Sequence, residues 1–232
     1  MMRKTISVGL VVLGVMAGKT AWADTYIYGT ITANAIWTLA GSPYIATDTV
    51  TIANGVVLTI KPGVTVRFAT ETSLICYGTL NAVGTSIGTI TFTSDQATHT
   101  AGYWNGIKLS GSGANGSQIS YCDIGYAEQA VYLENVSGIV ITHNYIHDNR
   151  GNSGASDSPG DVGCGIYLSS STNNTISGNL ISNNQGGIGG GTGGWYASGS
   201  SGGVGCGIYL SSSTNNTISG NTISNNQGGI GG

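Results

Sequence analysis

The feature that most constrains the fold is an internal repeat. The stretch GIYLSSSTNNTISGN occurs at residues 165–179 and again, unchanged, at 207–221. The wider segments 162–190 and 204–232 differ at a single position. Self-similarity at a fixed period is the signature of a repeat architecture, in which each unit packs on its neighbours. We therefore expect a chain that grows by stacking copies of one structural unit.

More diverged copies of the same unit lie upstream. Residues 131–149 align without gaps on 166–184 and share a tyrosine, a leucine, two isoleucines and two asparagines. A weaker fourth copy begins at Ile107 and carries two extra residues in its middle. The repeat therefore covers the C-terminal half of the chain.

Each unit contains three short apolar pieces separated by Ser, Thr, Asn and Gly. The first piece alternates apolar and polar residues with a period of two, which is typical of a strand. A unit of this size cannot bury its own apolar face and must stack on the next one. The sequence predicts an all-β solenoid, a parallel β-helix with three short strands per coil and asparagines at the bends, where their side chains stack.

The composition agrees with strands and turns. Charged residues make up only 7% of the chain, glycine contributes 40 of 232 residues, and the hydrophobic share is 40%. The chain is poor in the charged helix formers and rich in Thr, Ser, Asn, Ile and Val. The hydrophobic share excludes a highly charged disordered chain.

The first 23 residues are predicted to be a secretory signal peptide. A basic start is followed by the apolar run 6–18 and by the small-x-small pattern that ends at Ala23. A membrane anchor is the alternative, but the apolar run is short for a membrane span and Lys19 follows it. We expect domains at 1–23 (signal peptide) and 24–232 (parallel β-helix), and an exported protein, periplasmic or extracellular. The mature chain keeps four basic and ten acidic residues, a formal charge of −6, which favours neither nucleic acid nor anionic membrane as a partner.

The N-terminal half carries a resemblance to a known family. The stretch TVTIANGVVLTIKPGVTVRFATETSLICYGTLNAVG, with the later TITFTSD and GYWNGIKL, resembles the front coils of exported bacterial right-handed β-helix proteins of the pectate-lyase-like superfamily. The NNTISGN and ISNN units are similar to repeats of its NosD-type members. The resemblance implies a right-handed helix over most of 44–232. It says little about function, because one fold hosts many activities.

Three functions are consistent with this resemblance. The leading hypothesis is a non-enzymatic envelope or extracellular protein that presents an elongated surface, to carbohydrate or to another cell-surface component. The second is a polysaccharide lyase, epimerase or hydrolase, which would need an acid and a base or two carboxylates on one outer face. The third, implied by the NosD-type repeats, is maturation of a copper site in the periplasm.

The densest group of candidate catalytic residues lies in HNYIHDNR: His143, His147, Asp148 and Arg150. A histidine beside a carboxylate is a general-base arrangement, and Asp123 and Glu128 lie in the preceding unit. In the two exact repeats the positions of His143, His147 and Asp148 hold glycine, serine and asparagine, which favours an ordinary outward or bend location. Copper prefers clusters of His, Cys and Met, and the predicted mature chain has no Met.

Calcium is a weaker alternative, and no other cofactor is expected. Asp157 and Asp161 lie in a loop close to Asp148 and offer oxygen ligands. Their spacing matches no known calcium-loop signature. Solvated loop acids are the simpler interpretation, so we assign no metal ligand.

Three tyrosines are the predicted ligand-binding residues. If the isoleucine and leucine of IYL point inward, then Tyr132, Tyr167 and Tyr209 point outward, with Lys108 at the same place in the preceding unit. Such a row is suited to packing on sugar rings or on a partner. The alternative is that the stacked rings only cover and stiffen the wall of the solenoid.

The cysteines lead to a prediction about neighbouring coils. Cys164 and Cys206 occupy equivalent repeat positions, and in adjacent coils they would be close enough for a disulfide. This requires the Gly-rich segment between the two copies to be an insertion. If a new coil instead begins at residue 187, the two cysteines are too far apart. We expect Cys76 and Cys122 to be single thiols, at an interior strand position and at the asparagine bend.

The last repeat ends at Gly232 with no helix or polar cap behind it. An open β edge invites pairing with another chain. We therefore expect either a β-helix that is incomplete at its C-terminus or end-to-end self-association.

Overall fold

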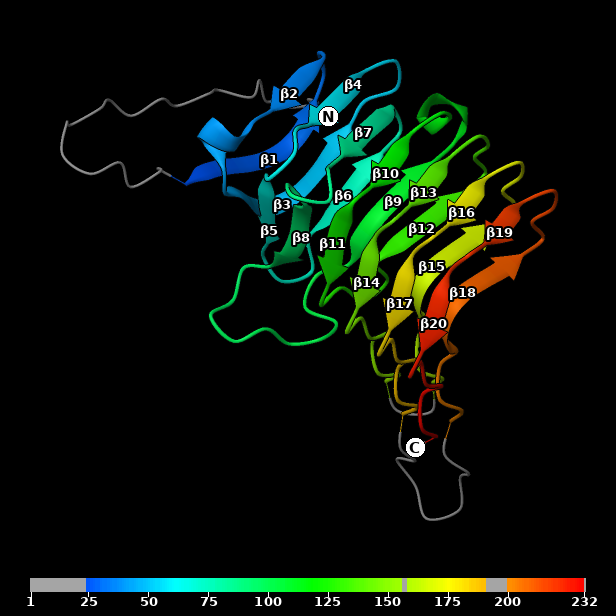
Figure 1. The fold of residues 1–232 in the computed structure, drawn as a ribbon. Coiled ribbons are helices and arrows are strands. Elements are labelled where there is room, and N and C mark those ends of the chain that lie inside the picture. Colours follow the sequence, from blue (N-terminus) through cyan, green and yellow to red (C-terminus); the bar gives the residue numbers. More distant parts are fainter. Residues whose placement is uncertain (1–23, 156–157, 191–199, 232) are drawn as a thin grey trace, which may run out of the picture.

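The computed structural model describes residues 24–155, 158–190 and 200–231. The predicted signal peptide lies outside the described residues. Figure 1 shows a solenoid whose coils follow one another from the N-terminal to the C-terminal end. The described chain contains no α-helix, only two short 3-10 turns, η1 (Leu39–Gly41) and η2 (Ser112–Ala114).

Three ladders of strands form the walls of the solenoid, and all pairs between named strands are parallel. The first ladder runs in the order β3 (Tyr44–Ile52), β6 (Ser73–Cys76), β9 (Gly106–Ser110), β12 (Val131–Glu134), β15 (Gly163–Ser169) and β18 (Gly205–Ser211). The second runs in the order β2 (Ala35–Trp37), β4 (Val57–Ile60), β7 (Thr79–Val83), β10 (Gln118–Ser120), β13 (Val140–Thr142), β16 (Thr175–Ser177) and β19 (Thr217–Ser219). The third runs in the order β5 (Thr65–Phe68), β8 (Ile90–Ser94), β11 (Cys122–Gly125), β14 (Tyr145–His147), β17 (Leu180–Ser182) and β20 (Thr222–Ser224).

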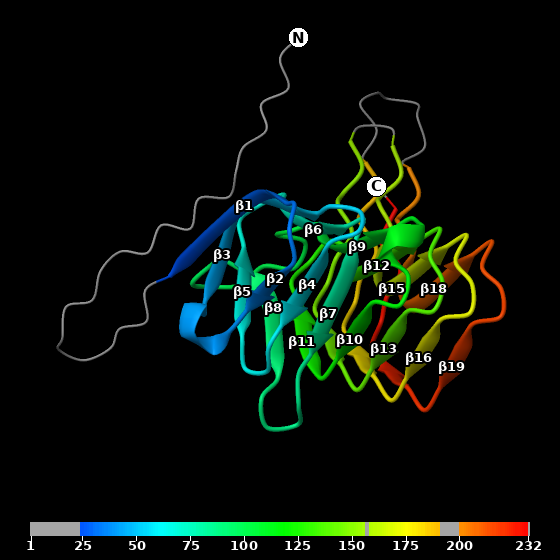
Figure 2. The ribbon, with the colours of Figure 1, turned by 90° about the horizontal axis from the view of Figure 1, so that it is seen from above.

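Strand β3 joins two of these walls. Its first residues pair with β5 and its last residues pair with β6, so the first and third ladders form one continuous sheet. Strand β1 (Thr25–Ile31) pairs with β3 and lies at the N-terminal end. Figure 2 shows the second ladder from above, with its strands in coil order. The predicted all-β parallel β-helix with three strands per coil is confirmed.

The core consists of rows of aliphatic side chains at equivalent positions. In the first ladder Ile107, Val131 and Ile166 pair in register, and all three are buried. In the third ladder Ile124, Ile146 and Ile181 do the same. Alternation along each strand places every second side chain inside, and the short aliphatic pieces of the repeat therefore become the packed interior.

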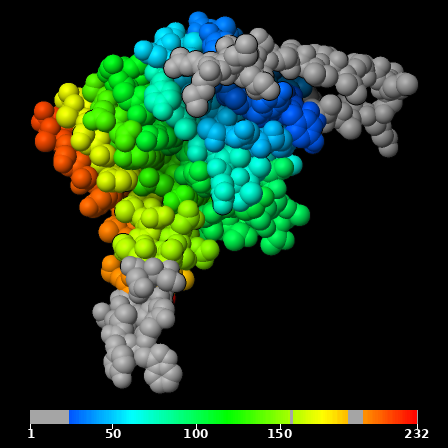
Figure 3. Space-filling model, turned by 180° about the vertical axis from the view of Figure 1, so that it is seen from behind, coloured from blue at the N-terminus to red at the C-terminus, as the bar shows by residue number. Residues whose placement is uncertain are grey.

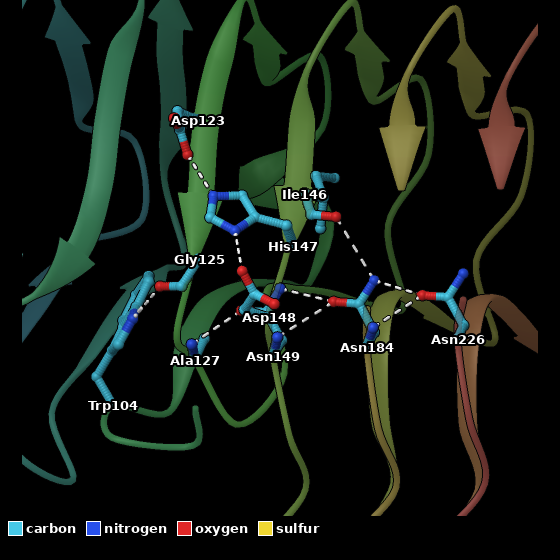
Figure 4. A network of polar contacts seen from close by, with 10 residues as sticks. All are labelled: Trp104, Asp123, Gly125, Ala127, Ile146, His147, Asp148, Asn149, Asn184 and Asn226. Carbon is cyan, nitrogen blue, oxygen red and sulfur yellow. Dashed lines mark hydrogen bonds and ion pairs between the residues drawn. The ribbon is translucent and has the colours of Figure 1, made fainter. Parts of the chain in front are cut away.

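Buried asparagines hold the bends together. The Asn144 side chain donates to Asn179 Oδ1 at 2.9 Å, and Asn179 donates to Asn221 Oδ1 at 2.9 Å. A second ladder at the end of the third wall joins Asn149, Asn184 and Asn226, with amide contacts of 2.8 and 2.7 Å (Figure 4). Each amide also bonds backbone groups of a neighbouring coil. The asparagines therefore satisfy buried polar groups where the backbone turns.

The Gly-rich segments form a second, smaller structure beside the solenoid. We call it the glycine spur: the described residues of 151–163, 185–190, 200–205 and 227–231, which protrude from one edge in Figure 1 and Figure 3. Its segments bond one another through the backbone; for example, Gly187 N donates to Asp161 O at 2.8 Å and Gly203 N donates to Gly187 O at 2.7 Å. A Cβ at Gly187 would overlap a backbone carbonyl. The segments approach so closely that only glycine fits there.

The last coil exposes residues that are buried in earlier coils. Leu210, Ile218 and Ile223 are 39%, 42% and 50% exposed, whereas their partners Leu168, Ile176 and Ile181 are fully buried. End-to-end self-association of this chain stays a prediction, and sedimentation over a concentration series tests it.

Candidate functional site

A row of aromatic side chains follows the outer face of the first ladder. Tyr132 on β12 pairs in register with Tyr167 on β15, which pairs with Tyr209 on β18. Lys108 on β9 precedes them in the same register. We call these four residues the tyrosine row. It exists because the period of the strand sends the middle residue of each IYL-type piece away from the core.

The rings of the tyrosine row stack on one another. The centroids of Tyr132 and Tyr167 are 5.0 Å apart with the planes at 18°, and those of Tyr167 and Tyr209 are 5.0 Å apart at 44°. Lys108 Nζ lies 4.9 Å from the Tyr132 centroid, a cation–π contact. Neighbours therefore cover most of the ring faces, and the row presents ring edges and phenol groups to solvent. Tyr209, at the open end, is 37% exposed.

Glu134 anchors the Lys108 end of the row. Its carboxylate lies 3.0 Å from Lys108 Nζ, and it accepts hydrogen bonds from Ser110 at 2.7 Å and from the Tyr132 hydroxyl at 3.2 Å. The bond from Ser110 first, and then Lys108, lower the pKa of Glu134 below its usual value. The positive charge of Lys108 is thus neutralised within the row.

A shallow pocket opens next to this anchor, with a cavity volume of about 170 Å³. It lies over β6 and β9 and reaches Tyr132, so the pocket and the tyrosine row are continuous. Its polar lining includes Ser73, Asn105, Lys108, Glu128 and Gln129. Burial first, and then the charge of Asp161 in the glycine spur, raise the pKa of Glu128, while a hydrogen bond with Asn152 acts in the opposite direction.

A separate polar cluster surrounds His147 at the end of β14 (Figure 4). His147 Nε2 lies 2.8 Å from Asp123 Oδ1, and Nδ1 lies 2.7 Å from Asp148 Oδ2. The ring stacks on Tyr145 at 4.1 Å. It also covers Gly125, where a Cβ would come within 2.9 Å of the imidazole. The histidine side chain is only 10% exposed.

This cluster favours a protonated His147. Burial disfavours the charged form, but the hydrogen bonds to Asp123 and Asp148, with their negative charges, outweigh burial and raise the pKa of His147. In that form both ring nitrogens donate to carboxylates, so neither carries a free lone pair. The arrangement is suited to tying neighbouring coils together and is poorly suited to a general base.

The other predicted catalytic residues lie in different surroundings. His143 is exposed and stacks on Tyr121 with centroids 4.9 Å apart. The Arg150 backbone N–H donates a hydrogen bond to Ala127 O, and Arg150 forms an isolated parallel β-bridge with Gln185. Among the described residues, His147 and Asp148 are the members of the predicted group that contact each other. Asp123, from the preceding coil, completes their cluster.

The residues considered for calcium and copper do not form a described metal site. The Asp148 carboxylate is hydrogen-bonded to His147, and the Asp161 backbone carbonyl accepts a hydrogen bond within the glycine spur. Asp157 lies outside the described residues. Within ranges 24–155, 158–190 and 200–231, no group of three or more His, Cys, Asp or Glu is arranged to hold a metal ion.

The two repeat cysteines are direct neighbours. Cys164 on β15 pairs in register with Cys206 on β18, their Cα atoms are 4.6 Å apart, and the structure joins them by a disulfide. The segment between the copies therefore inserts no coil between β15 and β18. Cys76 and Cys122 are buried free thiols. The Cys122 N–H donates to Asn144 Oδ1, which places this cysteine at the asparagine bend.

The residues of these sites that the sequence motifs do not single out include Glu134, Gln129 and Tyr145. Glu134 lies two residues after Tyr132, so the strand period alone places it on the same face. Gln129 and Tyr145 had no such signal, because the first lies in a turn and the second replaces a leucine of the repeat. Their roles depend on neighbours from other coils.

The fold and the stacked outer rows define a class: repeat proteins of the parallel β-helix type. A family model described as "Right handed beta helix region" matches residues 81–231, more than half of the chain. The chain belongs to this right-handed β-helix family.

Comparison with individual proteins adds little about function. The chain is similar to "Protein bark beetle" of Drosophila melanogaster, with 40% identity over 70 residues, which is 30% of this chain and 2% of that protein. The chain thus spans a very small part of this relative. No solved structure matches significantly. Within the described residues, no helix is long and apolar enough to cross a membrane.

Proposed function

We propose that this protein is an exported, non-enzymatic β-helix protein that binds carbohydrate along the outer face of the first ladder. The observation that carries the proposal is the tyrosine row, which continues over four coils and leads into a pocket lined by polar groups. A glycan is an extended ligand with polar hydroxyls and apolar ring faces. A long face with phenol groups and aromatic edges is complementary to such a ligand.

The details of the row determine how a glycan would be bound. The Tyr132 hydroxyl already donates a hydrogen bond to Glu134. The hydroxyls of Tyr167 and Tyr209 have no hydrogen-bond partner among the described residues and are available to sugar hydroxyls. The outer ring face of Tyr209 is free of the stacking that covers its neighbours, so it is the place for packing against a sugar ring.

The test is a binding measurement on the secreted protein with a panel of neutral and acidic glycans. Changing Tyr132, Tyr167 and Tyr209 together to serine should abolish binding and leave the strand-type circular dichroism intact. The stacked pairs contribute about 0.5–1.5 kcal/mol each, so a modest loss of stability is expected. Tyr26→Ser, on exposed β1, is the matched control and should bind like the wild type.

A triple Tyr→Phe variant separates the two roles of the row. It keeps the stack and removes the hydroxyls, so it should remain as stable as the wild type and bind more weakly. Unchanged binding by the serine variant would refute the proposal and leave the row with a stiffening role only.

The enzymatic alternative rests on one observation, the half-buried Glu128 with its raised pKa beside the pocket and near Asp161. Following product release in the same glycan panel distinguishes the two functions. Released oligosaccharides that disappear in Glu128→Gln would favour the enzyme. The copper alternative would need histidines with free ring nitrogens. Both ring nitrogens of His147 are hydrogen-bonded to carboxylates.

A further inference from the structure

One residue that lines the pocket beside the tyrosine row carries an unpartnered polar atom. Gln129 lines this pocket, and its Nε2 atom is buried and has no hydrogen-bond acceptor among the residues that the structure describes. A buried donor without an acceptor is costly, and native structures rarely leave one. The last torsion of a glutamine side chain is broad and soft. A small rotation of the amide therefore turns this donor toward a ligand in the pocket.

The charged groups around the pocket disfavour the binding of an anion. Lys108 is the cation of the lining, and Glu134 already neutralises it at 3.0 Å. Glu128 is an acceptor in the lining, and Asp161 is a second carboxylate near it. Asn105 donates its amide to Glu71 O and leaves its own carbonyl oxygen as an acceptor. An incoming carboxylate would face these oxygens without a free cation to meet it.

The size of the pocket limits the ligand as well. At about 170 Å³ it is smaller than the ~300–1,000 Å³ typical of sites for drug-sized ligands. It is open along Tyr132, so a longer molecule would continue onto the tyrosine row. The pocket therefore suits one ring at the end of a chain.

We propose that this pocket is a subsite for a single uncharged sugar residue and that it discriminates against uronic acids. A sugar hydroxyl both donates and accepts. A neighbouring pair of hydroxyls can accept from the amide of Gln129 and donate to the carboxylate of Glu128. A uronate carboxylate has acceptors only and carries the same charge as Glu128. The inference rests on the proposed carbohydrate-binding function and specifies its ligand.

The experiment compares neutral oligosaccharides (cello-, xylo- and manno-oligosaccharides) with oligogalacturonates by calorimetry on the secreted protein at neutral pH. We expect the wild type to bind at least one neutral series about tenfold or more tightly than the galacturonates. Gln129→Leu should weaken that binding about tenfold, since it removes one hydrogen bond. It should not lower the thermal midpoint, because it also removes an unsatisfied donor.

One further variant is a matched control, and a second tests the role of the charge. Gln118→Leu makes the same change at an exposed position on β10, in the second ladder, and should bind like the wild type. Glu128→Gln keeps the shape of the side chain and removes its charge. It should reduce the difference in affinity between neutral oligosaccharides and oligogalacturonates.

The failures of the two proposals are distinguishable. A wild type that binds no glycan overturns the proposed function and this inference with it. If the tyrosine variant loses binding while Gln129→Leu does not, the subsite is wrong and the binding face stands. Tighter binding of galacturonates than of neutral sugars also overturns the subsite alone.

Discussion

Replacing His147 by alanine should destabilise the protein more at mildly acidic than at alkaline pH. The imidazole lies between the carboxylates of Asp123, from the preceding coil, and Asp148, at 2.8 and 2.7 Å. Tyr145 stacks on it, and Tyr126 meets it edge-on at 5.5 Å. These are the titratable groups that contact the ring, and its removal leaves the two carboxylates without their shared cation.

The magnitude follows from these contacts. Two hydrogen bonds to charged groups contribute about 1.5–3 kcal/mol each. The two aspartate side chains are 39% and 38% exposed, so solvent screening reduces the sum by about half. The expected pH-dependent loss is about 1.5–3 kcal/mol. Loss of the stack on Tyr145 adds about 0.5–1.5 kcal/mol at any pH.

The sign of the pH dependence is set by the raised pKa of His147 in the folded protein. Below the unfolded pKa of about 6.5 the residue is protonated in both states and its full contribution is present. As pH rises through the higher folded pKa, the proton leaves and the contribution is lost. The difference between wild type and variant should therefore be largest near about pH 6 and should shrink toward about pH 9.

Denaturant unfolding followed by circular dichroism at several pH values measures this difference. His143→Ala is the matched control: that ring is exposed and stacks only on Tyr121 among the described residues, so the loss of stability should be small. If His147→Ala costs the same at both ends of the pH range, folding does not raise the pKa of the histidine and the reasoning fails.

Three further predictions concern the solenoid and its spur. Asn179→Ala removes four hydrogen bonds at a buried bend and should lower the free energy of unfolding by about 3 kcal/mol or more, measured by denaturant titration; a loss below about 1 kcal/mol would contradict the role of the ladder. Cys206→Ser opens a cross-link between residues 42 apart and should cost about 4 kcal/mol in the chain-entropy model; non-reducing peptide mapping that finds both thiols free in the purified wild type would remove its basis. Gly187→Ala should speed hydrogen exchange in the glycine spur, since its Cβ would overlap a carbonyl, whereas Gly228→Ala has room and should not; equal exchange in the two variants would count against the close packing of the spur.

The sequence alone determined the repeating part of this molecule. The period of two within VYL and IYL, repeated in successive units, dictates that Val131 and Leu133 are buried and that Tyr132 faces outward. Asn144, Asn179 and Asn221 recur at one place in the repeat, and stacking brings them into one ladder. These features follow from local spacing, because a solenoid converts equal positions in the sequence into neighbours in space.

Only the tertiary structure decided what departs from the repeat. The spacing of Cys164 and Cys206 left two arrangements open, and only the pairing of β15 with β18 selects adjacent coils. The sequence makes His147 a candidate base beside Asp148, but Asp123 of another coil engages its second nitrogen. The pocket at Gln129 and the contacts of the glycine spur likewise join segments whose separation follows no period. Their positions depend on how loops of unequal length fold back, and no local pattern encodes that.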